Sequence, residues 1–124
     1  MTTTATKTVT ASLANYRGTP RKMRLLADFV RGKVAKKAVA ELSFVNKRHA
    51  SAMADLIRSA LANAANNSDL ADETLVVSDI QVQEGKSLRR HRAGSQGRAI
   101  LFRRRLSHVQ VTLAPKTQAH NNSN

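Results

Sequence analysis

The segment from Lys86 to Arg105 is the feature of this sequence that most limits how the chain can fold. It contains eight lysine and arginine residues and no aspartate or glutamate. Seven of the eight are arginine, whose planar guanidinium group binds phosphate through paired hydrogen bonds and stacks on nucleobases. A segment of this charge cannot enter a hydrophobic core, and its like charges repel one another. We therefore expect it to lie outside the core and to meet an anionic partner.

The residues on both sides of this basic segment alternate between apolar and polar, as in β-strands with one buried face. The apolar positions are Val76, Ile80 and Val82 in the first run, and Ile100, Phe102, Val109, Val111 and Leu113 in the second. Their parity changes between Phe102 and Val109, which predicts a bulge or twist near residues 103–107. Antiparallel pairing of the two runs gives one long hairpin, whose distal half is expected to lack apolar residues.

A short strand and a first helix are expected near the N-terminus. Alternating residues from Val9 to Leu13 predict the strand, and residues 15–18 predict a turn after it. Thr19 and Pro20 suit the N-cap and the first position of a helix. Gly32 suits the end of that helix, because glycine readily adopts the left-handed conformation found there.

Two further helices are expected before the hairpin. The second runs from Val34 to about Phe44, where apolar residues can share one face. The third begins near Asn46 and keeps a spacing of three to four residues between apolar positions as far as Ala64. The polar run from Asn66 to Asp69 ends it, because short polar side chains compete with the helix backbone. An acidic loop through Asp72 and Glu73 follows.

The length of 124 residues fits one domain. We expect residues 8–114 to form it, with residues 1–7 and 115–124 as disordered polar tails. Aromatic residues make up only 3% of the chain, and we interpret most of them as core; they are Tyr16, Phe29, Phe44 and Phe102. Their scatter argues against a protein that reads single strands on an aromatic platform.

Several function classes find no support in the residues. The chain has no cysteine, which excludes disulfides and thiolate chemistry. Its histidines, which are His49, His91, His108 and His120, have neither matched carboxylates nor metal-ligand spacing. No glycine-rich phosphate loop, secretory signal or apolar run of the ~20 residues that span a bilayer is present. We expect no catalytic activity, no cofactor, no metal site and no membrane partner.

Two groups of basic residues are the candidate binding residues. The hairpin group is Lys86, Arg89, Arg90, Arg92, Arg98, Arg103, Arg104 and Arg105. The body group is Arg17, Arg21, Lys22, Arg24, Arg31, Lys33, Lys36 and Lys37, with Asp28 as the only acid among them. Cations in the first turn of a helix are opposed by the helix dipole, and an external anion would relieve that conflict. A formal net charge of +13 indicates nucleic acid, bound with an affinity that falls with salt.

Specific motifs are shared with one known family. In the C-terminal part they are Glu84-Gly85, Arg89-Arg90, Gly97-Arg98-Ala99, Arg103-Arg104-Arg105 and Ser107-His108-Val109. Upstream they are Thr19-Pro20-Arg21-Lys22-Met23-Arg24, Arg31-Gly32, Asn46-Lys47 and Ser59-Ala60-Leu61-Ala62-Asn63-Ala64. Over about residues 8 to 113 the chain resembles the universal large-subunit ribosomal protein twenty-two family in its bacterial form.

This resemblance implies an α+β fold, in which three helices pack on a small three-stranded antiparallel sheet with a long protruding β-hairpin at about residues 83–108. It implies a structural constituent of the large ribosomal subunit, in the cytoplasm or an organelle, that binds 23S-type ribosomal RNA, supports subunit assembly and lines the nascent-peptide exit tunnel. Ribosomal protein four would be a neighbour. Both basic groups and His108 would contact ribosomal RNA. The tip that meets the nascent peptide would be His91, Arg92, Ala93, Gly94, Ser95, Gln96 and Gly97.

The hairpin departs from the family pattern at two places. Gly85-Lys86 stands where the family commonly has Gly-Pro, and Ala93-Gly94-Ser95 stands where it commonly has Pro-Arg-Ala. A tip without proline should be more flexible. The arginine missing from the tip is flanked here by Arg92 and Arg98.

The alternative function is that of an architectural DNA-binding protein with a basic β-ribbon arm, a class that also combines small helices with a high pI. Such arms usually insert an apolar or proline wedge between base pairs, and the tip sequence offers neither. A protein of the membrane surface is disfavoured, because no predicted helix pairs a basic face with a bulky apolar face.

Overall fold

The computed structural model describes residues 8–67 and 75–115. Its elements are β1 (Val9–Tyr16), α1 (Pro20–Val30), α2 (Ala35–Leu42), α3 (Ala50–Asn67), β2 (Leu75–Ala93), the short 3-10 helix η2 (Ser95–Gly97) and β3 (Ala99–Pro115). The three strands form one antiparallel sheet in the order β1-β3-β2. These elements confirm the expected α+β class. The acidic loop and nearly all of the two expected tails lie outside the described residues.

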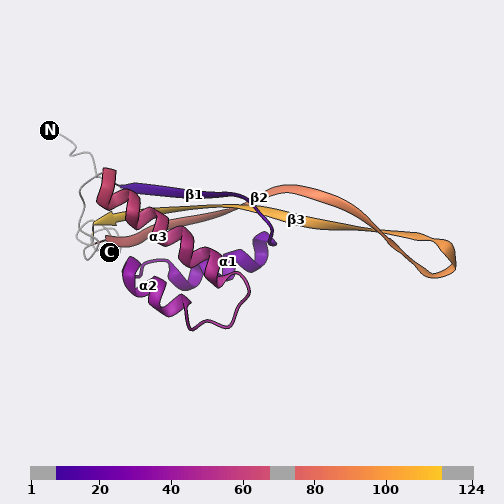
Figure 1. The fold of residues 1–124 in the computed structure, drawn as a ribbon, viewed down its shortest axis with the longest axis horizontal. Coiled ribbons are helices and arrows are strands. Elements are labelled where there is room, and N and C mark those ends of the chain that lie inside the picture. The colour runs from indigo at the N-terminus through magenta and orange to yellow at the C-terminus, as the bar shows by residue number, and fades with distance from the viewer. Residues whose placement is uncertain (1–7, 68–74, 116–124) are drawn as a thin grey trace.

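The helices cover one face of the sheet (Figure 1). Helix α3 packs on β1 and β3, whereas α1 packs on β2 and β3. The core is aliphatic and includes Met23 and Val30 of α1, Met53 and Ile57 of α3, and Leu113 of β3, none of which is exposed to solvent. Burying each such side chain contributes roughly 1.5–3 kcal/mol.

The connection between α1 and α2 pairs with the start of the free edge of β2. Gly32 N–H donates to the Val77 carbonyl at 2.9 Å, and Val77 N–H donates to the Lys33 carbonyl at 2.9 Å. Gly32 makes this turn at φ +84°, a conformation that favours glycine, as expected for the residue that ends α1. The connection therefore covers the start of the β2 edge.

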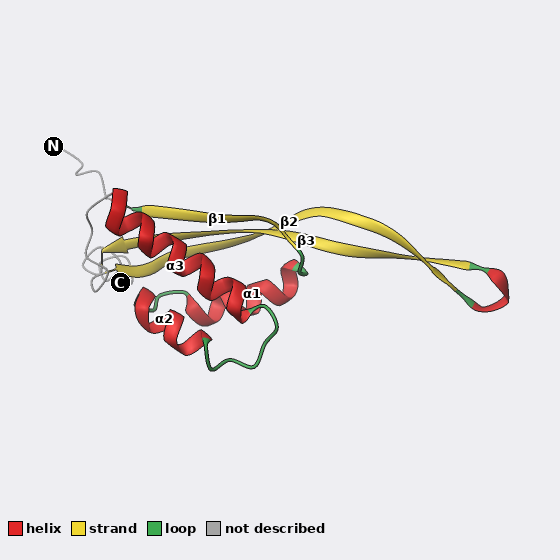
Figure 2. Cartoon of the chain, viewed as in Figure 1, coloured by secondary structure: helices red, strands yellow, loops and turns green. Residues whose placement is uncertain are grey.

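Beyond the body, β2 and β3 continue alone as a twisted arm (Figure 2). Pairing of β1 with β3 ends at Tyr16 and Ser107, but β2 and β3 stay paired from Ser87 and Arg105 out to Ala93 and Ala99. At the root of the arm two residues of β2, Gly85 and Lys86, oppose one residue of β3. The expected irregularity near residues 103–107 is present, but the extra residue belongs to β2. This geometry favours glycine at position 85, because a Cβ there would lie 3.1 Å from the Leu106 carbonyl oxygen.

Three expectations about the elements were wrong. Helix α3 begins at Ala50, since Asn46 to Arg48 are exposed and the first buried apolar residue of the period is Ala50. The first strand continues through Asn15, which adopts φ +56°, to Tyr16. The distal arm does carry large apolar side chains, since Ile100 is 54% and Leu101 47% exposed.

None of the four aromatic residues is fully buried, although Tyr16 packs against the core. Phe44 is 89% and Phe29 38% exposed, and Tyr16 and Phe102 are only half-buried. Aliphatic and alanine side chains fill the interior instead. The reason is geometric, because Leu26 and Val30 of α1 already occupy the positions that face the sheet, so Phe29 is left on the flank of the helix.

Candidate nucleic-acid interface

The arm presents arginine on both faces, because side chains alternate along each strand. By the strand register, Arg89, Arg103 and Arg105 share one face, while Arg90, Arg92 and Arg104 share the other. All six are exposed. Arg89 lies directly opposite Arg103, and like charges in that position destabilise a strand pair. An external polyanion can stabilise both faces of the arm.

Phe102 organises the second of these faces. The guanidinium of Arg92 lies 4.9 Å from the centre of its ring and that of Arg104 lies 5.6 Å away. Such cation–π contacts contribute roughly 0.5–1 kcal/mol at exposed sites. They hold two flexible arginines in a defined spacing, which reduces the entropy lost when the arginines bind a ligand.

The connecting loop at the end of the arm is shorter than the tip segment, residues 91–97, that the family resemblance implies. His91, Arg92 and Ala93 are paired with residues of β3, so the connecting loop spans only residues 94–98. Within it Gly94 N–H donates to the Arg98 carbonyl at 2.5 Å. A side chain on Gly94 would meet Ile100 at 2.8 Å and the Arg98 carbonyl at 2.9 Å, so the close approach of the chains requires glycine there. Arg98 is exposed, next to the strand start.

The two basic groups meet at the root of the arm. A groove of about 420 Å³ there is lined by Arg21, Lys22 and Arg24 from the start of α1, by Arg105 from the arm and by Glu84 of β2 just before it. The first turn of α1 contains no acid, and the side chain of Thr19 makes no capping hydrogen bond. Free backbone N–H groups at a helix start attract anions. The groove carries four cations, and its one acid, Glu84, lies 3.8 Å from Arg105.

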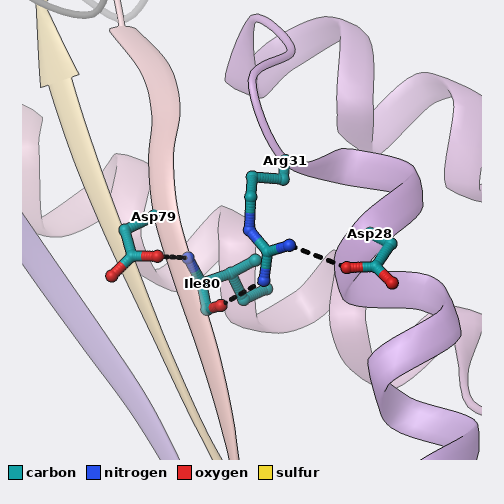
Figure 3. Close-up of polar contacts among 4 residues, drawn as sticks. All are labelled: Asp28, Arg31, Asp79 and Ile80. Carbon is teal, nitrogen blue, oxygen red and sulfur yellow. Dashed lines mark hydrogen bonds and ion pairs between the residues drawn. The ribbon is translucent and has the colours of Figure 1, made fainter. Parts of the chain in front are cut away.

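Arg31 and Arg24 also have a role within the body. One guanidinium nitrogen of Arg31 donates to the Ile80 carbonyl at 2.8 Å and the other to the Asp28 carboxylate at 2.7 Å (Figure 3). Arg24 donates to the Val82 carbonyl of the same strand at 3.3 Å. The Ile80 N–H is held in turn by the Asp79 carboxylate at 2.9 Å. These contacts link α1 to β2, which sequence reasoning did not foresee.

The other members of the body group are dispersed. Lys33 forms an ion pair with Glu41, and its ammonium lies 3.6 Å from the ring centre of Phe29. The hydrogen bond from Lys33 is the main cause that lowers the pKa of Glu41, and it outweighs the partial burial of that carboxyl. Lys36 and Lys37 are exposed on α2, away from the arm root, and Arg17 is exposed between β1 and α1. Lys86, which belongs to the hairpin group, lies exposed in the bulge of β2.

His108 supports the backbone at the arm root. Its Nδ1 accepts the N–H of Asn15 at 3.0 Å, the residue that adopts a positive φ. Its Nε2 lies 3.1 Å from the position that a side chain on Gly85 would take. The pairing of β1 with β3 also shifts register, between Leu13 and Tyr16, and His108 lies between this irregularity and the bulge of β2.

Three basic residues outside both groups also lie on the surface. Lys47 and Arg48 precede α3, and Arg58 pairs with Asp55 along it at 2.9 Å. Lys47 and Arg48 line a second groove, together with Lys22 of α1. The shared motif Asn46-Lys47 was the sequence signal that these residues could be functional. The groove was not predicted, because the third helix was expected to begin near Asn46 and the loop that forms the groove was therefore assigned to that helix.

Within residues 8–67 and 75–115, no set of three His, Cys, Asp or Glu side chains is placed to hold a metal ion. Among the helices of the same residues, none combines the length and apolar character needed to span a bilayer.

Known proteins resemble this chain over most of its length. The model of the family described as ribosomal protein L22p/L17e matches residues 11–114. A protein of Rubrobacter xylanophilus is 44% identical over 103 residues, which cover 82% of this chain and 81% of that protein. A protein of Thermus thermophilus is 41% identical over 106 residues, covering 85% and 94%. Both relatives are named large ribosomal subunit protein uL22. The chain belongs to the ribosomal protein L22p/L17e family.

Proposed function

We propose that the protein is a structural constituent of the large ribosomal subunit that binds large-subunit ribosomal RNA through its arm and the arm root. The observation that carries the proposal is the projecting pair of strands, which places three arginines on each face where no core can form. A rod with charge on both sides fits insertion between RNA helices, where phosphates approach from more than one direction. The name of its relatives agrees with this assignment.

The proposal includes subunit assembly, cytoplasmic location and a tip at the nascent-peptide exit tunnel. The loop at residues 94–98, with His91 to Ala93 paired behind it, would face the nascent peptide, and ribosomal protein four would lie nearby. The body group and His108 would contact ribosomal RNA along with the hairpin group. Arg21 and Lys22 are the strongest members of the body group, since they share a groove with Arg105; Arg24 lines the same groove but also donates to the Val82 carbonyl. Arg31 and Lys33 are the weakest, since both have partners inside the protein.

Sedimentation tests this function. The protein should travel with large subunits and dissociate only in concentrated salt, because phosphate contacts weaken steeply as salt rises. The test variant replaces Arg89 and Arg103 by glutamine, which removes the directly opposed pair of cations. It should bind a ribosomal RNA fragment more weakly and with a salt slope lower by up to about 0.9 for each lost duplex phosphate contact.

A DNA-bending protein remains the competing function, and one observation favours it. Ile100 and Leu101 are exposed close to the tip, where a β-ribbon arm that bends DNA would place an apolar wedge. Competition between structured ribosomal RNA and duplex DNA separates the two functions. Sedimentation with nucleoids and tighter binding to duplex DNA would contradict the ribosomal proposal.

A further inference from the structure

An apolar groove lies on the flank of the body, next to the arm-root groove with which it shares Lys22. It has a volume of about 580 Å³ and runs between α1 and the connection that leads from α2 into α3. Its apolar lining includes Leu25, which is 63% exposed, Phe29, which is 38% exposed, and Val45. Large apolar side chains at this exposure cost free energy in water unless a ligand covers them.

The charged lining of the groove has one sign. Lys22, Lys47 and Arg48 line it, and none of its lining residues is acidic. The ammonium of Lys33 lies 3.6 Å from the centre of the Phe29 ring and covers one face of it. An occupant must therefore combine an apolar surface with negative charge close by.

The side chains of His49 and Asn46 add hydrogen-bonding capacity to this groove. The Tyr16 hydroxyl lies 2.8 Å from His49 Nδ1, and the two rings meet edge to face at 5.3 Å. This contact fixes the histidine and leaves its Nε2 available to a ligand. Asn46 supplies an amide that both donates and accepts, which suits the edge of a nucleobase.

We infer that this groove binds one unpaired nucleotide of the RNA partner, with the base packed against Leu25 and Phe29 and the phosphates near Lys22, Lys47 and Arg48. Proteins that recognise RNA commonly take an unstacked base onto an aromatic side chain and bond its edge. The inference rests on the proposed function, because it names a further contact of the same RNA partner. It concerns a surface of the body that shares only Lys22 with the arm-root groove.

The dimensions of the apolar lining favour a base over a peptide helix. Leu25 and Phe29 are one helical turn apart, which corresponds to about 6 Å along α1. A docked amphipathic helix needs a series of anchor sites over at least two turns. A single planar base matches the shorter surface, and its phosphates match the three cations.

Binding of short RNA by the full-length protein tests the inference. The probes are a fluorescent oligouridylate and an abasic oligomer of equal length and charge, compared by anisotropy at low salt. Because stacking of a base contributes roughly 1–3 kcal/mol, the oligouridylate should bind at least about fivefold more tightly. Leu25→Ser and Phe29→Leu should each reduce this ratio, and a thermal melt shows whether each variant is folded. Leu25 is exposed, so its substitution should leave the fold intact.

Phe44→Ser is the matched control, because Phe44 is 89% exposed but does not line the groove. It should leave the ratio unchanged. Equal binding of the two probes by the natural protein, or a ratio that Leu25→Ser and Phe29→Leu leave intact, overturns the inference. So does displacement by an acidic peptide without preference for the oligouridylate, since that result assigns the groove to a protein partner. Binding of a ribosomal RNA fragment and its salt dependence are measured in parallel. If the protein still binds this fragment in a salt-dependent way, the proposed function holds even when the nucleotide-binding inference is refuted.

Discussion

Replacing Arg31 by methionine should lower the thermal stability of the free protein and leave the salt dependence of RNA binding almost unchanged. Methionine keeps the aliphatic part of the side chain and removes the guanidinium that joins α1 to the Ile80 carbonyl of β2. It also removes the ion pair with Asp28. The perturbation therefore separates a role inside the body from a role in binding.

The magnitude follows from the two contacts. A hydrogen bond from a charged group contributes about 1.5–3 kcal/mol when it is well shielded. The Arg31 side chain is 45% exposed, so we reduce the expected contribution of its hydrogen bond with the Ile80 carbonyl to about 1 kcal/mol. The exposed ion pair with Asp28 adds about 0.3–0.5 kcal/mol. For a domain of this size a loss of about 1.5 kcal/mol lowers Tm by about 5–9 °C.

Thermal melts by circular dichroism and a salt titration with a ribosomal RNA fragment measure the two effects. Lys36→Met is the control, because Lys36 is exposed and takes part in no ion pair among the described residues. Its Tm should not change. An unchanged Tm for Arg31→Met, together with a salt slope lower by about 0.9, would refute the reasoning and make Arg31 a phosphate contact.

Three further predictions concern the arm and His49. Replacing residues 88–104 with Asn-Gly leaves the directly paired Ser87 and Arg105 on either side of a two-residue turn, so the body should melt cooperatively while RNA affinity falls; an unfolded product would contradict an independent body. Gly85→Val should destabilise the arm root by about 1–3 kcal/mol in a denaturant titration, because its side chain would meet the Leu106 carbonyl; an unchanged midpoint would exclude this crowding. Burial lowers the pKa of His49, with Arg48 and Lys22 adding to the effect, so the unfolded chain binds the proton more tightly. Stability should be complete above about pH 6.5 and fall below it, and His49→Gln should show a smaller fall in Tm at acidic pH.

Much of the fold follows from local patterns. The helical spacing around Met53 and Ile57, the alternation of Val109 and Val111, and the acid-free segment after Lys86 each specify an element without reference to the rest of the chain. The arm was predictable because its sequence can enter no core. The boundaries at Ala50 and in the tip were less predictable, because they depend on which residues meet a neighbouring element.

The candidate binding residues were predictable by type and less so by role. A count of charges cannot separate Arg31, which bonds a carbonyl 49 positions away, from Arg21, which lines an open groove. Nor can it show that Phe29 lies on a flank beside Lys47. Such pairs arise from contacts between elements far apart in the sequence, and the period of one helix carries no information about its neighbours.

The sequence by itself determined the helices, the paired strands and a basic segment that lies outside the core, because periodicity and charge act locally along the chain. Only the tertiary structure decided that the start of α1 meets Arg105 at the arm root, that Arg31 holds the edge of β2, and that two aromatic side chains remain exposed. The physical reason is that packing assigns each side chain its neighbours, and those neighbours decide whether a cation supports the protein or remains available to an anion.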